Sequence, residues 1–97
     1  MSNSSRIFED PGGSYTGGYV SNELQATVSA HLSNATRGVV QVHILAGTVD
    51  FQMRIHFDAP WLTIKTFTVD TIEEIVIGNY MRVIVSDSAK VWLGQTT

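Results

Sequence analysis

The sequence predicts an all-β protein: a small antiparallel β-sandwich, jelly-roll-like, with about seven strands and an extended N-terminal arm. The strongest indication is residues 48–57, in which apolar and polar residues alternate almost without exception. Because successive side chains of a strand point to opposite faces, this segment is predicted to be one strand with an apolar face and a polar face exposed to solvent. Short alternating segments follow one another at intervals of roughly 8–12 residues, which is the spacing of sandwich and barrel strands.

Residues 1–23 differ in composition from the rest of the chain. They contain Pro11 and the pairs Gly12-Gly13 and Gly17-Gly18, which disfavour regular structure. A flexible terminus is one interpretation, but a simple linker would have little need of aromatic residues. We therefore expect residues 1–23 to form an extended arm ahead of a β-sandwich domain at 24–97. The aromatic residues expected to dock, on the arm's own domain or on a neighbour, are Phe8, Tyr15 and Tyr19.

The first four expected strands each place alternate apolar residues on one face. They span residues 25–32, 39–45, 48–57 and 61–68. In the fourth, Leu62 and Ile64 share one face, whereas Trp61 and Phe67 lie on the other. The inward residues expected in the first three strands are Ala26, Val28, Ala30, Leu32, Val40, Val42, Ile44, Val49, Phe51, Met53, Ile55 and Phe57.

Three further strands are expected at 72–77, 80–86 and 89–93. Asp70 could cap a helical turn at the first of these, which is the alternative there. A strand is favoured because Ile75-Val76-Ile77 is β-branched and Gly78 follows at once. The inward residues expected in the last two strands are Met81, Val83, Val85, Val91 and Leu93.

Matching the apolar faces predicts two hairpins. In one, the strands at 39–45 and 48–57 are joined by the turn Ala46-Gly47, which places Val42 opposite Phe51. In the other, the strands at 80–86 and 89–93 pair with Val83 opposite Val91 and Arg82 opposite Trp92. Ser86-Asp87-Ser88 is then the turn.

The composition excludes several classes of protein. The 97 residues suit one domain, and a 43% hydrophobic, 15% charged composition fits a folded chain that covers part of its surface by assembly. A net charge of −3 with scattered cations disfavours nucleic-acid binding. The absence of cysteine excludes disulfides and thiolate metal sites. We expect neither a secretion signal nor a membrane span.

Candidates for catalysis are weak. His31, His43 and His56 lie on the polar faces of three consecutive predicted strands, and three histidines can bind zinc, but the predicted registers do not align them. Glu73 and Glu74 are adjacent on a strand and point to opposite faces, so they cannot act as a pair. We therefore expect a non-enzyme with no catalytic residue, no metal and no cofactor.

Several large residues lie on strand faces that are expected to be exposed to solvent. Contiguous exposed apolar surface is typical of an interaction site, and tryptophan and arginine are enriched in interfaces. We interpret these residues as a subunit interface. Coverage by the arm, or a sugar-stacking platform at Trp61 or Trp92, are the alternatives. The interface residues are Trp61, Phe67, Arg82, Ile84 and Trp92.

A series of short motifs runs through residues 38–94: Gly47-Thr48-Val49, Asp58-Ala59-Pro60-Trp61, the Thr-rich strand at 63–68, Tyr80-Met81-Arg82-Val83 and Val91-Trp92-Leu93. Together they resemble small structural proteins of tailed bacteriophages, in particular capsid decoration (cement) proteins and related head-fibre modules. Ala59-Pro60 departs from that pattern, in which a Gly-rich turn is usual.

The resemblance implies a non-enzymatic virion protein on the capsid exterior, synthesised in the host cytoplasm. Such a protein binds the major capsid protein and stabilises the head as a homo-oligomer, commonly a trimer, without nucleic-acid or membrane partners. The arm, through Phe8, Tyr15 and Tyr19, would then contact the capsid or a neighbouring subunit. The alternative is a carbohydrate- or receptor-binding β-sandwich module of a tail or fibre.

Overall fold

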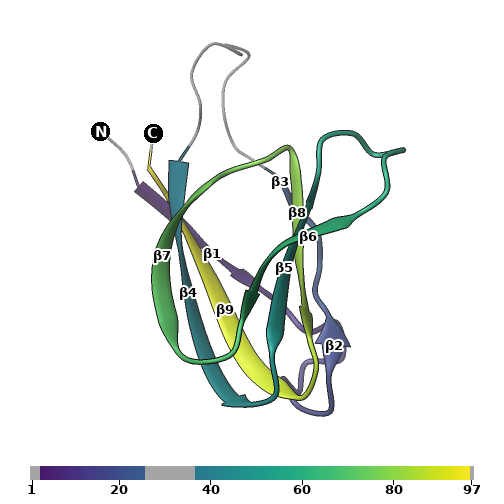
Figure 1. Cartoon of the computed structure of the whole chain (residues 1–97), viewed down its shortest axis with the longest axis vertical. Helices are drawn as coiled ribbons and strands as arrows, with labels where there is room; N and C mark the ends of the chain where they lie inside the picture. Colours follow the sequence, from purple (N-terminus) through teal and green to yellow (C-terminus); the bar gives the residue numbers. More distant parts are fainter. Residues whose placement is uncertain (1–2, 26–36, 97) are drawn as a thin grey trace.

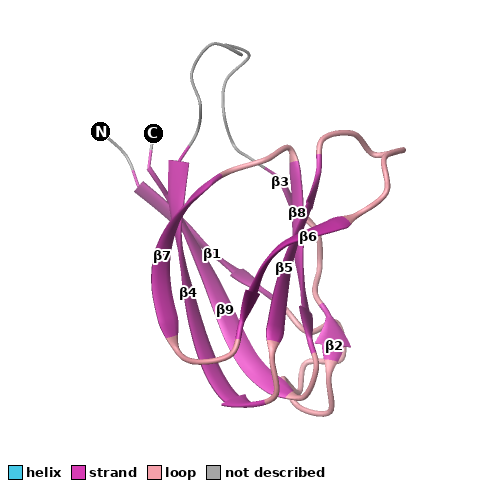
Figure 2. Ribbon diagram, viewed as in Figure 1, coloured by secondary structure: helices cyan, strands magenta, loops and turns pink. Residues whose placement is uncertain are grey.

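The computed structural model describes residues 3–25 and 37–96, and all regular structure within these ranges is β-strand, as Figure 2 shows. The all-β prediction is confirmed, including a strand rather than a helical turn at Thr71–Val76. The described strands are β1 (Asn3–Phe8), β2 (Tyr19–Val20), β3 (Leu24–Gln25), β4 (Arg37–Ala46), β5 (Val49–Arg54), β6 (Leu62–Phe67), β7 (Thr71–Val76), β8 (Tyr80–Val85) and β9 (Ser88–Thr96).

The strands form two antiparallel sheets. Sheet A has the strand order β1-β9-β4-β7, and sheet B has the order β2-β8-β5-β6. The short strand β3 also pairs with β8, beyond β2 along the same edge. Figure 1 shows the two sheets as layers, and the connections β4–β5, β6–β7 and β8–β9 each pass from one layer to the other.

The core lies between the sheets and is built from alternate residues of the central strands. The phenyl rings of Phe8 and Phe51 meet edge to face, with centroids 6.0 Å apart. Burying each such side chain contributes roughly 1.5–3 kcal/mol. The alternation correctly predicted these fully buried residues: Val40, Val42, Val49, Phe51, Met81, Val83, Val85, Val91 and Leu93.

Both predicted hairpins are wrong. β4 pairs with β7 and β9, whereas β5 pairs with β6 and β8, so Val42 does not lie opposite Phe51. β8 and β9 also belong to different sheets, so neither Arg82 nor Val83 is paired with β9. Alternation determines which face of a strand is apolar, but two apolar faces can meet across a sandwich as well as side by side.

The β4–β5 and β8–β9 connections, which pass between the sheets where hairpins were predicted, are joined to each other by hydrogen bonds. Gly47 has a φ of +84°, a conformation that favours glycine, where the chain leaves sheet A for sheet B. The backbone N–H of Thr48 donates to Ser86 Oγ at 2.7 Å, and the N–H of Ser86 donates to the carbonyl oxygen of Thr48 at 2.9 Å. Hydrogen bonds therefore tie β4–β5 to β8–β9 at one end of the sandwich.

Residues 3–25 are part of both sheets rather than an arm that extends away from them. β1 pairs with β9 along its whole length, and the side chain of Phe8 has no exposed surface. The backbone N–H of Ser21 donates to the carbonyl oxygen of Val83 at 2.9 Å, and the backbone N–H of Val83 donates to the hydroxyl of Ser21 at 2.9 Å. The expected domain boundary at 23/24 falls between β2 and β3, which both pair with β8. The expected strand 25–32, apart from Gln25, lies outside the described residues.

A β-bulge in β6 corrects the face predicted for Phe67. Phe51 pairs with Lys65, but the next residue of β5, Gln52, pairs with Thr63. The extra residue in β6 interrupts the alternation of faces, so that odd-numbered residues point to one face before the bulge and to the opposite face after it. Phe67 is consequently in the core, with 3% exposure, whereas Trp61 lies on the outer face of sheet B.

Candidate functional site

The outer face of sheet A carries a row of polar and aromatic side chains from its two central strands. The register places His43 opposite Lys90 and Gln41 opposite Trp92. Trp92 is half-buried, while Leu45, at the end of β4, is 70% exposed. Antiparallel neighbours on one face are in contact, so β4 and β9 together present a continuous surface there.

The loop after β1 is folded by the carboxylate of Asp10. It accepts hydrogen bonds from the backbone N–H groups of Gly12 at 2.8 Å, Ser14 at 3.2 Å and Tyr15 at 2.9 Å. The bond from Gly12, with smaller contributions from Ser14 and Tyr15, lowers the pKa of Asp10. Tyr15 adopts a φ of +57°, which is uncommon for a residue with a side chain. The loop therefore holds Tyr15 in one orientation.

Tyr15 lies over β9. The ammonium of Lys90 is 4.6 Å from the centroid of the Tyr15 ring, within the range of a cation–π interaction. The ring of Tyr15 also meets Tyr19 edge to face at 5.9 Å. Tyr19 donates from its hydroxyl to the carbonyl oxygen of Ala89 at 2.7 Å. These contacts fasten the loop to sheet A.

Between this loop and the two strands lies an open groove of about 550 Å³, which we call the Tyr15–Trp92 groove. Its walls combine the apolar side chains of Tyr15, Leu45 and Trp92 with the polar side chains of His43 and Lys90. Small-molecule sites are typically concave, mostly apolar, and supplied with a few polar groups. This arrangement is suited to binding a ligand that has both apolar and hydrogen-bonding surface.

His43 links the groove to Asp70, which directly precedes β7, the edge strand of sheet A. Its Nδ1 lies 3.1 Å from Asp70 Oδ2, and Asp70 Oδ1 accepts the backbone N–H of Ile44 at 2.8 Å. The bond from Ile44, followed by the one with His43, lowers the pKa of Asp70. His56 lies in the loop between β5 and β6, where its Nδ1 accepts the N–H of Asp58 at 3.1 Å, and His31 is outside the described residues. Within residues 3–25 and 37–96, no three His, Asp or Glu side chains are grouped to hold a metal ion.

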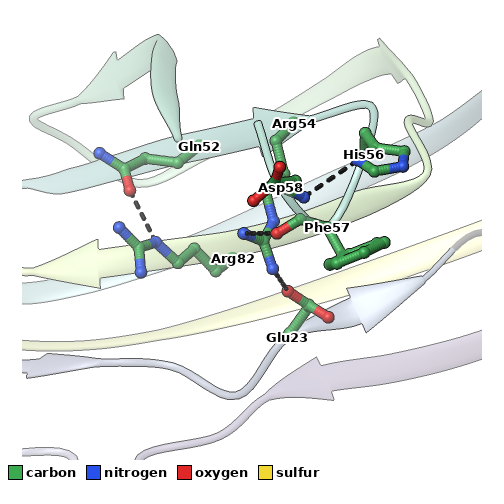
Figure 3. A network of polar contacts seen from close by, with 7 residues as sticks. All are labelled: Glu23, Gln52, Arg54, His56, Phe57, Asp58 and Arg82. Carbon is green, nitrogen blue, oxygen red and sulfur yellow. Dashed lines mark hydrogen bonds and ion pairs between the residues drawn. The ribbon is translucent and has the colours of Figure 1, made fainter. Parts of the chain in front are cut away.

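The outer face of sheet B holds a second cluster, which we call the arginine–tryptophan cluster: Arg54, Arg82 and Trp61. The guanidinium carbons of both arginines lie 4.5 Å from the centroid of the Trp61 ring. Figure 3 shows Arg54 donating to the carbonyl oxygen of Phe57 at 2.7 Å and to Glu23 at 2.8 Å. It also shows Arg82 donating through Nε to Gln52 Oε1 at 2.7 Å.

A third surface is formed where both sheets end. β6 and β7 are edge strands of sheets B and A, and a 3.3 Å ion pair between Lys65 and Glu73 connects them. Large aliphatic side chains on these strands and their connection are 52–66% exposed. We call these exposed residues the β6–β7 flank: Leu62, Ile64, Val69, Ile72 and Val76, of which Ile72 and Val76 point outward from sheet A.

The residues that were predicted to form one subunit interface do not lie together in the structure. Trp61, Arg82 and Ile84 lie on sheet B and Trp92 lies on sheet A, while Phe67 is a core residue. Of the residues predicted to contact the capsid, Phe8 is also in the core. Tyr15 lines the groove, and Tyr19 packs partly buried against the core.

Sequence reasoning missed the partners Glu23, Arg54 and Lys90. Arg54 alternates with apolar residues in the long strand, which placed it on an outer face without indicating what it meets there. Glu23 and Lys90 reach their partners through contacts between segments far apart in the sequence, which spacing alone does not reveal.

The described residues contain no helix that is long and apolar enough to cross a membrane. Comparison with known proteins finds no match: no family model fits this chain, and no curated protein or solved structure is significantly similar to it.

Proposed function

We propose that this protein is a non-enzymatic structural protein of a phage virion, which binds the capsid from outside and stabilises it as a homo-oligomer, expected to be a trimer. The observation that carries the proposal is the β6–β7 flank. Edge strands offer unpaired backbone groups to another chain, and soluble proteins usually protect them with charge. Here the charged residues on these edges are paired, Lys65 with Glu73 and Arg37 with Glu74. The remaining exposed surface is largely aliphatic, which favours association.

The strand order supports the same proposal. If β2 and β3 are one interrupted strand, each sheet has four strands, β1-β9-β4-β7 and β2/β3-β8-β5-β6. We assign this order to the jelly-roll class, which includes viral capsid and lectin domains. A fold does not determine a function, so the assignment adds to the argument from the flank without replacing it.

Capsid binding is tested by co-sedimentation of the full chain with empty phage capsids. We expect saturable binding that is weakened by Tyr15→Ala, because the Tyr15 side chain lines an open groove that a partner can enter. Val20→Ala, which removes an exposed side chain of the same segment outside the groove, is the matched control. Deleting residues 1–22 is unsuitable because it would remove β1 and the buried Phe8. Absence of saturable binding would contradict the proposal.

A second candidate is a carbohydrate- or receptor-binding module, and the Tyr15–Trp92 groove favours it. Trp92 is the better stacking platform, because Trp61 already contacts two guanidinium groups. A glycan screen by calorimetry should then find a ligand whose binding is lost in Trp92→Ala and kept in Trp61→Phe. Loss of binding in neither variant, or the absence of any glycan ligand, would exclude this candidate.

A further inference from the structure

The arginine–tryptophan cluster has more positive than negative charge. Arg54 and Arg82 share the ring of Trp61, and the carboxylate of Glu23 forms its ion pair with Arg54. Like charges held close together repel one another, and burial weakens their screening by water. Burial, followed by the charge of Arg54, lowers the pKa of Arg82. An additional anion near Arg82 would offset both effects.

The two arginines differ in the donors that they leave free. Arg54 uses both terminal nitrogens, Nη1 for Phe57 and Nη2 for Glu23, and its Nε is buried without a hydrogen-bond partner. Arg82 bonds through Nε, and its Nη1 and Nη2 meet no hydrogen-bond acceptor in the described ranges. Figure 3 shows the bond between Gln52 and Nε of Arg82 and draws no contact to the two terminal nitrogens of Arg82. The terminal nitrogens of Arg54 are therefore engaged and its remaining donor is buried, whereas the terminal nitrogens of Arg82 can receive a ligand.

Arg82 is also held in a fixed orientation. Gln52, which accepts its Nε–H, donates through Nε2 to Thr63 Oγ1 at 3.0 Å, so the chain Thr63–Gln52–Arg82 runs across sheet B. The indole of Trp61 supports the guanidinium at 4.5 Å. A guanidinium that is already oriented loses less side-chain entropy when it binds.

We propose that Arg82, supported by Trp61 and Gln52, is a binding site for a carboxylate presented by a partner protein. A planar guanidinium with two free N–H donors matches the two oxygens of a carboxylate in a bidentate pair. A partner with an extended polyanion, such as nucleic acid, is disfavoured because the chain has a net charge of −3. This site does not depend on the virion function proposed above.

The test follows the fluorescence of Trp61 in the variant Trp92→Phe, which leaves Trp61 as the only indole. The full chain is titrated at pH 7 and constant ionic strength with sodium acetate, sodium phosphate or sodium chloride. We expect a saturable change with acetate and none with chloride. Saturation with phosphate but not acetate, or with neither anion, would overturn the proposal.

Variants identify the site. Arg82→Gln in the same background should weaken acetate binding by roughly tenfold or more, because a charge-assisted bidentate pair is lost. Arg82→Lys should give an intermediate loss, since it keeps the charge without the fork. Arg37→Gln, a surface arginine of sheet A, is the matched control and should bind acetate as before. Circular dichroism checks that each variant is folded, and unchanged binding in a folded Arg82→Gln would contradict the assignment.

Discussion

The hydroxyl of Tyr19, on β2 of sheet B, donates a 2.7 Å hydrogen bond to the carbonyl oxygen of Ala89, on β9 of sheet A. The side chain therefore bridges the two layers at the sandwich edge formed by the N-terminal segment. We predict that Tyr19→Phe lowers the free energy of unfolding by about 1 kcal/mol, measured by urea denaturation. Tyr15→Phe is the control, because the described contacts of Tyr15 involve its ring and backbone. Equal stability of Tyr19→Phe and the unmodified chain would contradict this role.

The same bond predicts a pH dependence at the alkaline end. Burial, followed by the charges of Tyr15 and Asp10, raises the pKa of Tyr19 to about 12 from an ordinary value of 10.0. The folded state therefore favours the neutral phenol, and this stabilisation is complete below pH 10 and lost as the pH rises from 10 towards 12. The stability difference between the unmodified chain and Tyr19→Phe should shrink over that range. A difference that is constant from pH 8 to 12 would contradict the prediction.

Burial of Phe8 predicts that the N-terminal segment is required for folding. We expect Phe8→Ala to lower the free energy of unfolding by about 3–5 kcal/mol, a large share of the stability of a domain of this size. Phe57→Ala, at a 66% exposed position, should change it by about 0.5 kcal/mol or less. Similar small effects in both variants would mean that β1 is dispensable, as expected for a separate arm.

Asp10 organises the loop that forms one wall of the Tyr15–Trp92 groove. Because the folded state lowers its pKa, the ionised carboxylate is the form that holds the loop, and its contribution is lost as the pH falls through the folded pKa, below 3.8. We predict that Asp10→Ala at pH 7 releases Tyr15 from Lys90. The measurement is the loss of nuclear Overhauser contacts between the Tyr15 ring and the Lys90 side chain. Retention of these contacts would show that other bonds suffice to hold the loop.

Much of the fold was predictable from local pattern, because burial of one face imposes alternation. The inward residues of β4, β5, β8 and β9 follow directly from it. The prediction was wrong for Ile55 and Phe57, which lie beyond the end of β5 and are 76% and 66% exposed. Alternation is the same whether two strands are neighbours or face each other across the core, so the pairing of Val42 with Phe51 was wrong. The face of Phe67 was also wrong, since a bulge changes parity without a distinctive residue.

The candidate sites were less predictable than the core. Trp61, Arg82, Tyr15 and Trp92 stood out by residue type, but their neighbours come from distant segments. The pairing of Arg54 with Glu23, and of Lys90 with the Tyr15 ring, depends on how β3 and the 10–16 loop pack on the sheets. A single sequence contains little information on such contacts.

The β6–β7 flank provides a variant that should separate the subunits without disturbing the core. Ile72 and Val76 are 66% and 57% exposed on β7, and lysine at both positions would place charge on the edge. Ile55→Lys, at a 76% exposed position outside the flank, is the matched control.

The most direct test of the central claim is the native mass in solution by light scattering. The account predicts a trimer for the unmodified chain and for Ile55→Lys, and a folded monomer for the double variant Ile72→Lys and Val76→Lys. A monomeric unmodified chain, or a trimer that persists in the double variant, would contradict the assembly proposed through this flank.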